Sequence, residues 1–186
     1  MPSTSFKVSF TLDEQDVAYF RNLFRKAKSA ARKSSRDEIL AGARSLVENV
    51  RTTKKTPKFV IAAIEAIEDL VAIIEDTDYK APKTVVEEVL GALAYFAEPE
   101  DLIPDDIPVL GFLDDAIMIK FVEREFKHEL EAFRKFKKFR AGAEQRPWTQ
   151  VAKGRLPGRL DTQREKLRAE VDKRRQADAK KGLIGF

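Results

Sequence analysis

The stretch from Tyr95 to Ala116, YFAEPEDLIPDDIPVLGFLDDA, lies between two apolar patterns of helical period and decides how the chain is divided. It carries three prolines and seven carboxylates but no lysine or arginine. Because each proline fixes its own φ and disfavours helix in the residue before it, the stretch predicts a rigid hairpin between two helices. Its apolar residues are too many for a free loop, so we expect them to close the end of a helical bundle.

Apolar residues on both sides of this hairpin recur at the spacing of helices that bury one face. The pattern predicts five helices, over about residues 12–32, 36–50, 57–74, 82–97 and 112–140. A capping box, in which Ser or Thr is followed three residues later by Glu, marks two helix starts, at Thr11 with Glu14 and at Ser35 with Glu38. Thr56 before Pro57 marks a third start, in the order of an N-cap and the first helical residue.

Residues 6–12 differ from the rest, because Phe6, Val8, Phe10 and Leu12 alternate with polar residues in the period of a strand with one buried face. The fold class predicted from these elements is mainly α. We expect a bundle of about five helices with one short N-terminal strand and a Pro- and Asp-rich hairpin between the last two core helices. An unpaired apolar strand also favours self-association, since a second copy can pair with its edge.

Charge divides the chain into three parts. Residues 1–55 carry twelve basic and six acidic side chains, residues 56–141 carry eleven and nineteen, and residues 142–186 carry twelve and six, so the nets are +6, −8 and +6. We therefore predict an N-terminal strand-helix-helix region over 1–55, a helical core over 56–141 and a basic tail over 142–186. Such a chain either folds back on itself or offers its basic ends to nucleic acid, an acidic protein or an anionic membrane.

The basic tail begins with a stretch rich in Gly, Pro, Arg and Lys. It continues as a highly charged helical segment, LDTQREKLRAEVDKRRQADAKK, which shows almost no apolar stripe. A helix of this kind buries too little apolar surface to order itself. We therefore expect residues 142–186 to form a flexible tail that folds only against a partner.

Composition restricts the possible sites. The chain has no cysteine, so it contains neither a disulfide nor a thiolate metal site. Its single histidine, His128, is expected to pack or to form a salt bridge on the helix over 112–140. The chain shows no Gly-rich phosphate loop, no secretory signal and no apolar run of about 18 residues. We therefore expect a cytoplasmic, non-spanning protein, and we identify no catalytic residue in it.

Eleven residues around the hairpin follow a fixed order: Tyr95, Pro99, Asp101, Leu102, Ile103, Pro104, Asp105, Pro108, Gly111, Asp114 and Asp115. This order resembles the signature of the YkvA-like family, bacterial proteins of unknown function, in which a Tyr-containing helix leads into a Pro- and Asp-rich segment. Many relatives carry the signature in an apolar, membrane-associated hairpin, whereas charged residues interrupt both flanking helices here. The resemblance implies a family but no established reaction.

The hairpin carboxylates support two interpretations. Asp114 and Asp115 fall in the first turn of the helix over 112–140, where carboxylates meet free amide donors and the positive end of the helix dipole. Alternatively, Asp101, Asp105, Asp114 and Asp115 converge on a divalent cation, Mg2+ or Ca2+, which prefers carboxylate oxygen. Their spacing matches no EF-hand loop, and the sequence leaves both interpretations open.

The N-terminal order of strand, helix, turn and helix resembles the ribbon-helix-helix fold, whose dimer sets two paired strands in the DNA major groove. The resemblance implies that Lys7, Ser9 and Thr11 face bases. It also implies that Arg36, at the start of the second helix, binds a phosphate. The first helix and its turn are, however, longer than this fold usually allows.

The segment FRKFKKFRA, residues 133–141, places Phe133, Phe136 and Phe139 among five cations. Such a stripe either docks its aromatic face on a core or lies on an anionic membrane surface. From all these patterns we predict a YkvA-like, non-catalytic binding or scaffold module that contacts a protein partner or a second copy of itself. The alternatives are a ribbon-helix-helix-like DNA-binding dimer and a divalent-cation-binding protein.

Overall fold

The computed structural model describes residues 11–30, 34–54, 56–97, 111–144 and 150–181. These residues form seven α-helices and a short 3-10 helix: α1 (Glu14–Ala30), α2 (Arg36–Thr52), α3 (Lys58–Glu75), α4 (Lys83–Leu93), η2 (Ala94–Ala97), α5 (Leu113–Glu125), α6 (Lys127–Glu144) and α7 (Gln150–Lys180). No strand occurs among them, so the mainly α class is confirmed, although seven helices replace the expected five. Most of the predicted strand and most of the hairpin fall in residues 1–10 and 98–110, outside the described residues.

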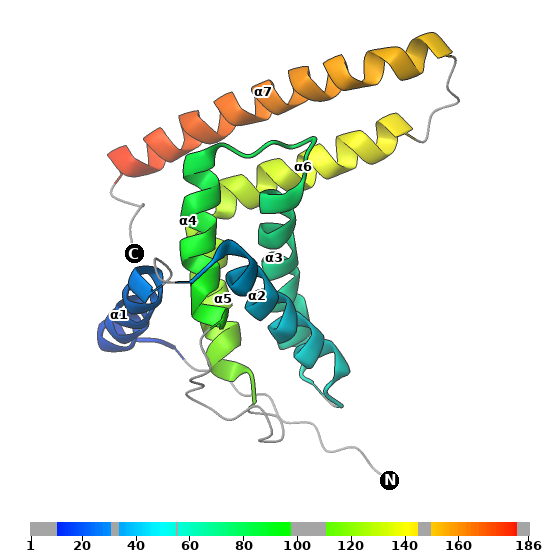
Figure 1. Ribbon diagram of the computed structural model, residues 1–186. Coiled ribbons are helices and arrows are strands. Elements are labelled where there is room, and N and C mark those ends of the chain that lie inside the picture. Colours follow the sequence, from blue (N-terminus) through cyan, green and yellow to red (C-terminus); the bar gives the residue numbers. More distant parts are fainter. Residues whose placement is uncertain (1–10, 31–33, 55, 98–110, 145–149, 182–186) are drawn as a thin grey trace, which may run out of the picture.

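The central helix of the core is α3, which carries ten buried residues. Its neighbours are α2, α4, α5 and α6, and α2 also packs against η2. Two of the largest buried side chains, Tyr79 and Phe133, come from the turn after α3 and from α6. The wide apolar face that the sequence predicts for residues 57–74 therefore becomes the centre of the bundle. At one end of the bundle α6 and α7 lie side by side and antiparallel (Figure 1).

The first helix starts with a different cap from the predicted one. Asp13, and not Thr11, is the N-cap residue: its Oδ1 accepts hydrogen bonds from the backbone amides of Gln15 (2.7 Å) and Asp16 (2.9 Å). Asp16 Oδ2 in turn accepts a hydrogen bond from the Asp13 amide at 3.0 Å. The capping box predicted at Thr11 is therefore wrong, because a carboxylate closer to the helix satisfies the same orphan amides.

The second helix starts as predicted. The Glu38 amide donates to Ser35 Oγ at 3.2 Å, and the Ser35 amide donates to Glu38 Oε2 at 2.6 Å. The start predicted at Thr56 is wrong, however, because the Thr56 hydroxyl donates back to the carbonyls of Val50 (3.0 Å) and Thr53 (2.9 Å). It therefore closes the turn after α2, and α3 begins without a side-chain cap at Pro57.

The single helix predicted over 112–140 is two helices, α5 and α6. Phe126 lies between them with φ −97° and ψ 15°, outside the helical region. Its amide still donates to the Val122 carbonyl (3.0 Å), and its carbonyl accepts from the Leu130 amide (2.9 Å). Because the Phe126 ring is buried and the backbone bonds continue on both sides, the apolar period runs through the bend and does not reveal it.

The last helix differs from the flexible tail expected over 142–186. In α7 the side chains of Leu160, Leu167 and Val171 are buried, and Leu156 is half-buried against the core. Their spacings of four, seven and four residues place them on one narrow face of the helix. Ion pairs with α4 and α6 add to this face, as described below. The division of the chain into three parts stays a prediction.

Helix α2 approaches η2 at a glycine. A Cβ atom added at Gly42 would lie 2.5 Å from the Ala97 Cα and 2.6 Å from the Ala97 Cβ. The two backbones can pack this closely only because Gly42 has no side chain. This contact joins the N-terminal helices to the segment that leads into the hairpin.

Candidate binding groove

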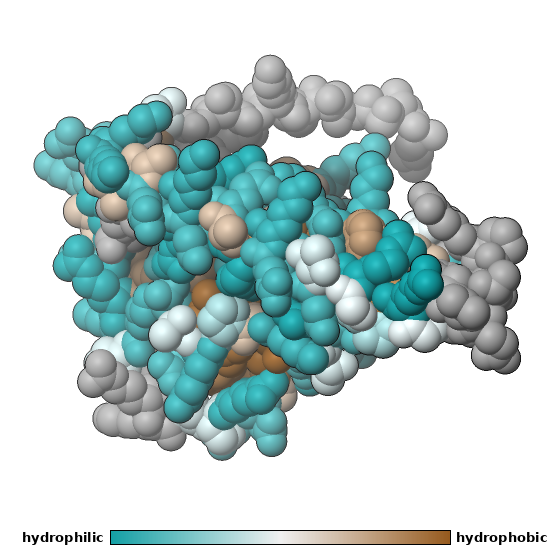
Figure 2. Space-filling model, turned by 90° about the horizontal axis from the view of Figure 1, so that it is seen from above, coloured by the Kyte–Doolittle hydropathy of each residue, from teal (hydrophilic) through white to brown (hydrophobic). Residues whose placement is uncertain are grey.

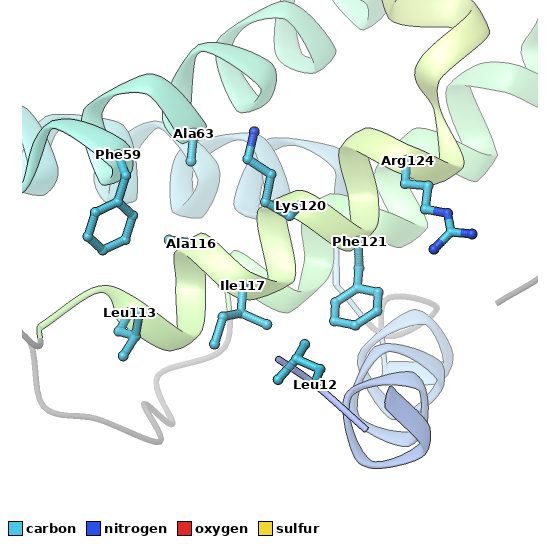
Figure 3. Close-up of a pocket in the computed structure, with 9 residues that line it drawn as sticks. All are labelled: Leu12, Phe59, Ala63, Leu113, Ala116, Ile117, Lys120, Phe121 and Arg124. Carbon is cyan, nitrogen blue, oxygen red and sulfur yellow. The ribbon is translucent and has the colours of Figure 1, made fainter. Parts of the chain in front are cut away.

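A groove opens between α3 and α5, near the ends of these helices that lie away from α7 (Figures 1 and 3). Its volume is about 600 Å³. Nine of the described residues line it: Leu12, Phe59, Ala63, Leu113, Ala116, Ile117, Lys120, Phe121 and Arg124. Seven of the nine are apolar and two are cationic, so the groove is an apolar site with a basic component.

One face of α5 supplies most of the lining. Leu113, Ile117, Lys120 and Arg124 follow each other at spacings of four, three and four residues, which places them in one row along the helix. The row is apolar over the first half of α5 and cationic over the second half. The groove therefore changes from apolar to basic along a single helix face.

The start of α5 is fixed by an unusual backbone conformation. Phe112 precedes the helix with φ 63° and ψ 13°, in the left-handed region that residues other than glycine rarely adopt. Its ring is nevertheless 98% removed from solvent, with a relative exposure of 2%. Burial of the ring compensates for the backbone conformation and anchors the first turn of α5, so that Leu113 faces the groove (Figure 3).

The opposite walls come from α3 and from the segment just before α1. Phe59 lies in the first turn of α3 and is 51% exposed, and Ala63 follows one turn later. Leu12, just before α1, faces Phe121 across the groove (Figure 3). The Phe121 ring stacks on Phe20 of α1, with the ring centroids 5.7 Å apart and an interplanar angle of 29°. Side chains from α3, α5 and the segment just before α1 thus form the groove.

The two cations of the groove are close to solvent. Lys120 Nζ lies 2.6 Å from Glu123 Oε2, with side-chain exposures of 63% and 32%. An exposed pair of this kind contributes about 0 to 1 kcal/mol, so another anion can replace Glu123 at little cost. Arg124 is also exposed, one turn further along α5. No carboxylate is among the nine lining residues, so the basic end of the groove favours an anion.

Only part of the predicted metal set can be placed. Asp114 and Asp115 lie in the first turn of α5, as expected, and both are buried. Asp101 and Asp105 lie outside the described residues, as do the motif prolines Pro99, Pro104 and Pro108. Among the residues that the structure does describe, no group of three or more His, Asp or Glu side chains could hold a metal ion. The cation site therefore stays a prediction.

Two other motif residues are described. Tyr95 is half-buried in η2, where its ring makes an edge contact with Phe96 at a centroid distance of 5.1 Å. Gly111 is buried in the turn that leads into α5. The Tyr thus precedes residues 98–110 and the Gly and the two Asp residues follow them, in the two described segments that flank this range.

The residues predicted to contact DNA are also only partly described. Lys7 and Ser9 lie outside the described residues, and Thr11 is an exposed residue ahead of α1. The Arg36 guanidinium has a partner within the chain, because it donates to the Ile74 carbonyl at 3.2 Å, near the end of α3. The ribbon-helix-helix role of these residues stays a prediction.

The aromatic stripe of residues 133–141 docks on the core, which was one of the two predicted interpretations. Phe133 and Phe136 are fully buried, and their ring centroids lie 5.0 and 5.3 Å from that of Tyr79. These two rings are therefore not available to a membrane surface. His128 forms the expected salt bridge, with Nε2 2.8 Å from Asp178 Oδ2 of α7.

A buried charged centre lies beneath α7, away from the groove. The Tyr79 hydroxyl donates to Glu129 Oε1 and Arg168 Nη1 donates to Glu129 Oε2, both at 2.7 Å. The Arg168 guanidinium also lies over the Tyr79 ring, 4.9 Å from its centroid. Burial, and then the Glu129 carboxylate, raise the pKa of Tyr79. This cluster joins the turn after α3 to α6 and α7.

Sequence reasoning did not identify the groove. In the sequence, Ile117 and Phe121 keep the apolar period of the helix predicted over 112–140, and Lys120 and Arg124 are among the charged residues that interrupt it. The signal was the order of these residues, since the cations continue the same helix face on which Leu113 and Ile117 lie. Phe59 carried no such signal, because its distance from α5 in the sequence hides their contact in space.

Comparisons with known proteins add one finding. A family model described as a protein of unknown function (DUF1232) matches residues 88–121. Comparisons with curated proteins and with solved structures gave no match. Among the described helices, none is both long and apolar enough to cross a membrane. The matched segment includes the motif from Tyr95 to Asp115 and most of the groove face of α5. Residues 88–121 are thus similar to the DUF1232 family of proteins of unknown function, the family resemblance that the YkvA-like motif predicted.

Proposed function

We propose that this protein is a non-catalytic binding module whose ligand is an amphipathic anion, an acyl chain with a carboxylate head. The groove between α3 and α5 is the proposed site. The apolar chain lies between Phe59, Leu113 and Ile117, and the carboxylate meets Lys120 and Arg124. The observation that carries the proposal is the change from apolar to cationic side chains along one face of α5.

The size of the groove supports a single chain as the ligand. A volume of about 600 Å³ lies within the range of small-molecule sites. The row from Leu113 to Arg124 is roughly 16 Å long, from the rise of a helix per residue. An extended chain of moderate length spans this row with its head at the basic end. Burial of apolar surface supplies the affinity, while the two cations orient the ligand.

The chemistry of the lining supports binding rather than catalysis. None of the nine described lining residues is a serine, a cysteine, a histidine or a carboxylate, and the amine of Lys120 is paired with Glu123. General acid or base catalysis needs a titratable side chain within hydrogen-bond reach of the reacting group. Lys120 and Arg124 suit recognition of an anion, because an ammonium and a guanidinium both donate charge-assisted hydrogen bonds to a carboxylate.

Calorimetric titration with dodecanoate, kept below its micelle concentration, tests the proposal. Wild-type protein should bind one dodecanoate and bind dodecanol more weakly. It should show no binding of dodecyltrimethylammonium. The double variant Lys120→Gln and Arg124→Gln should bind dodecanoate roughly tenfold more weakly, since two exposed charge pairs contribute about 1.4 kcal/mol together. The same variant should bind dodecanol as the wild type does.

Two aspartate variants locate the site. Ile117→Asp introduces a carboxylate in the apolar part of the groove and should abolish binding. Ile61→Asp is the matched control, because Ile61 also lies near the groove end of α3 but is 44% exposed and does not line the groove. Equal binding by wild type and Ile117→Asp, or binding that prefers the cationic amphiphile, would refute the proposal.

A further inference from the structure

The two faces of α7 differ in whether their charged side chains are paired with the core. Residues 150–180, which form the helix, hold ten basic and five acidic side chains. The inner face is paired with the core: Arg168 binds Glu129, Arg175 binds Glu88 at 2.8 Å, and Glu170 binds Lys135 at 2.8 Å. Asp178 adds contacts to Lys127 (2.5 Å) and His128 (2.8 Å). These pairs fix the rotation of α7 about its axis and so decide which side chains point outward.

A row of lysines runs along the outer face. Lys166, Lys173 and Lys180 are separated by seven residues, about two helical turns, and therefore lie one above another. All three are exposed, and Arg155 and Arg159 continue the basic surface toward the start of the helix. None of the three lysines forms a salt bridge with a described carboxylate, which distinguishes them from the cations of the inner face. Seen from the α7 side, the surface is predominantly hydrophilic (Figure 2).

The outer face, over the described part of α7, carries no large apolar side chain. Thr162, Ala169 and Gln176 lie beside the row of lysines, and Glu165 and Asp172 follow on the same side. A helix that binds a membrane surface needs large apolar side chains beside its cations. In α7 those side chains are Leu160, Leu167 and Val171, which are buried against the core. This face therefore suits a polyanion with evenly spaced charges better than a lipid membrane, whose binding also requires apolar side chains.

We infer that the outer face of α7 binds the phosphate backbone of a nucleic acid without reading its sequence. The row from Arg159 to Lys180 is roughly 32 Å long, from the helical rise per residue. Over that length each strand of a duplex presents a phosphate about every 3.4 Å. The inner ion pairs hold the backbone positions of the lysines in a fixed line, so little backbone freedom is lost on binding. This surface is separate from the groove on α5 and does not depend on its ligand.

Fluorescence anisotropy with labelled nucleic acids tests the inference on the full-length protein. A mixed-sequence DNA duplex, the matching single strand and an RNA duplex should all bind, and their affinity should fall steeply with salt. The triple variant Lys166→Gln, Lys173→Gln and Lys180→Gln should bind at least about tenfold more weakly at low salt. Its plot of log affinity against log salt should be shallower by about 3 units, roughly one per lost phosphate contact.

A second triple variant controls for net charge. Lys26, Lys54 and Lys58 are also exposed, but they lie on other helices and turns. Changing these three lysines to Gln removes the same charge and should change the affinity by less than about twofold. The inference is overturned if both triples weaken binding equally, if no nucleic acid binds, or if vesicles containing phosphatidylglycerol bind in place of nucleic acid.

Discussion

Tyr79 is the residue at which three parts of the molecule meet. It lies in the turn after α3, it donates to Glu129 of α6, and it lies under Arg168 of α7. It is 1% exposed. Burial raises its pKa, and the adjacent carboxylate adds to the shift, because both oppose formation of a phenolate. The folded protein therefore holds the Tyr79 proton more tightly than the unfolded chain does.

The raised pKa of Tyr79 predicts a loss of stability in alkali. The protonated Tyr79 hydroxyl makes its full contribution to the free energy of unfolding at pH values below about 10, the pKa of a tyrosine in the unfolded chain. Above that value the unfolded state loses the proton first, so the free energy of unfolding falls as pH rises, by up to about 1.4 kcal/mol per pH unit. Urea unfolding at several values between about pH 9 and about pH 11 should show this slope in the wild type. A Tyr79→Phe variant that keeps the full slope would contradict the prediction.

Replacing Glu129 should strongly lower the free energy of unfolding. Its side chain is 5% exposed, and its partner Arg168 is 18% exposed. Glu129→Leu leaves the Arg168 guanidinium buried without a counter-ion, so the free energy of unfolding should fall by about 3 to 5 kcal/mol. Glu131→Leu is the matched control: its pair with Arg174 has exposures of 52% and 41%, and its loss should cost less than about 1 kcal/mol. Equal losses in chemical denaturation would show that Glu129 is not a buried anchor.

At the scale of elements, two glycines predict opposite effects of the same substitution. Gly42→Ala places a Cβ against the backbone of Ala97 and should separate α2 from η2, with a loss of about 1 to 3 kcal/mol. Gly142 lies in α6 with nothing within 4 Å of an added Cβ. Gly142→Ala should therefore raise the free energy of unfolding by about 0.4 to 1 kcal/mol. Thermal melts of both variants check the pair, and an unchanged Gly42→Ala midpoint would contradict it.

Helices with a wide apolar face were predictable, because the spacing of their apolar residues is a local property of the sequence. Helices α2, α3 and α4 fall where Ile39, Val60 and Val85 begin apolar stripes. The bend at Phe126 was not predictable from period, since an apolar residue occupies the bend itself. The packing of α7 was missed for a related reason, because ion pairs with distant residues such as Glu88 add to a narrow apolar face. Such pairs depend on the fold, which a single helix pattern does not contain.

The candidate site was predictable only in part. The family match over residues 88–121 was predicted from the order of Pro, Asp, Gly and Tyr residues in the motif. The groove was not predicted, because one wall is Phe59, far from α5 in the sequence. The sequence shows Lys120 and Arg124, which form the cationic half of the groove. Whether they line a groove depends on which face of α5 the neighbouring helices leave uncovered. Apolar period alone cannot distinguish a buried face from one that lines a groove.

At the scale of the whole molecule, the charge pattern of the sequence is partly explained by contacts within the chain. The acidic middle segment receives the inner face of the basic α7, so one of the two predicted outcomes, a chain that folds back on itself, occurs at this end. The outer lysines of α7 are not used in this way. Basic residues of α7 therefore serve two purposes, docking on the core and exposure to an external anion.

The docking of α7 predicts a specific response to salt. Three of its ion pairs, with Lys135, Glu131 and Glu88, join side chains that are at least 35% exposed. Salt screens such pairs, whereas it leaves the apolar contacts of α3 unaffected. Hydrogen exchange should therefore become several-fold faster in the amides of α7 as NaCl rises from about 50 mM to about 500 mM, with little change in α3. Equal responses in both helices would contradict this prediction.

The central claim is that the groove on α5 binds an acyl anion, and methyl NMR tests it most directly. Protein labelled at Ala and Ile methyl groups reports on Ala63, Ala116 and Ile117 in the groove, and on Ala43 and Ile73 in the closed core. Titration with dodecanoate should shift the three groove methyls along one saturable curve and leave the two core methyls unchanged. Groove methyls that do not move, or shifts shared by all five residues, would contradict the claim.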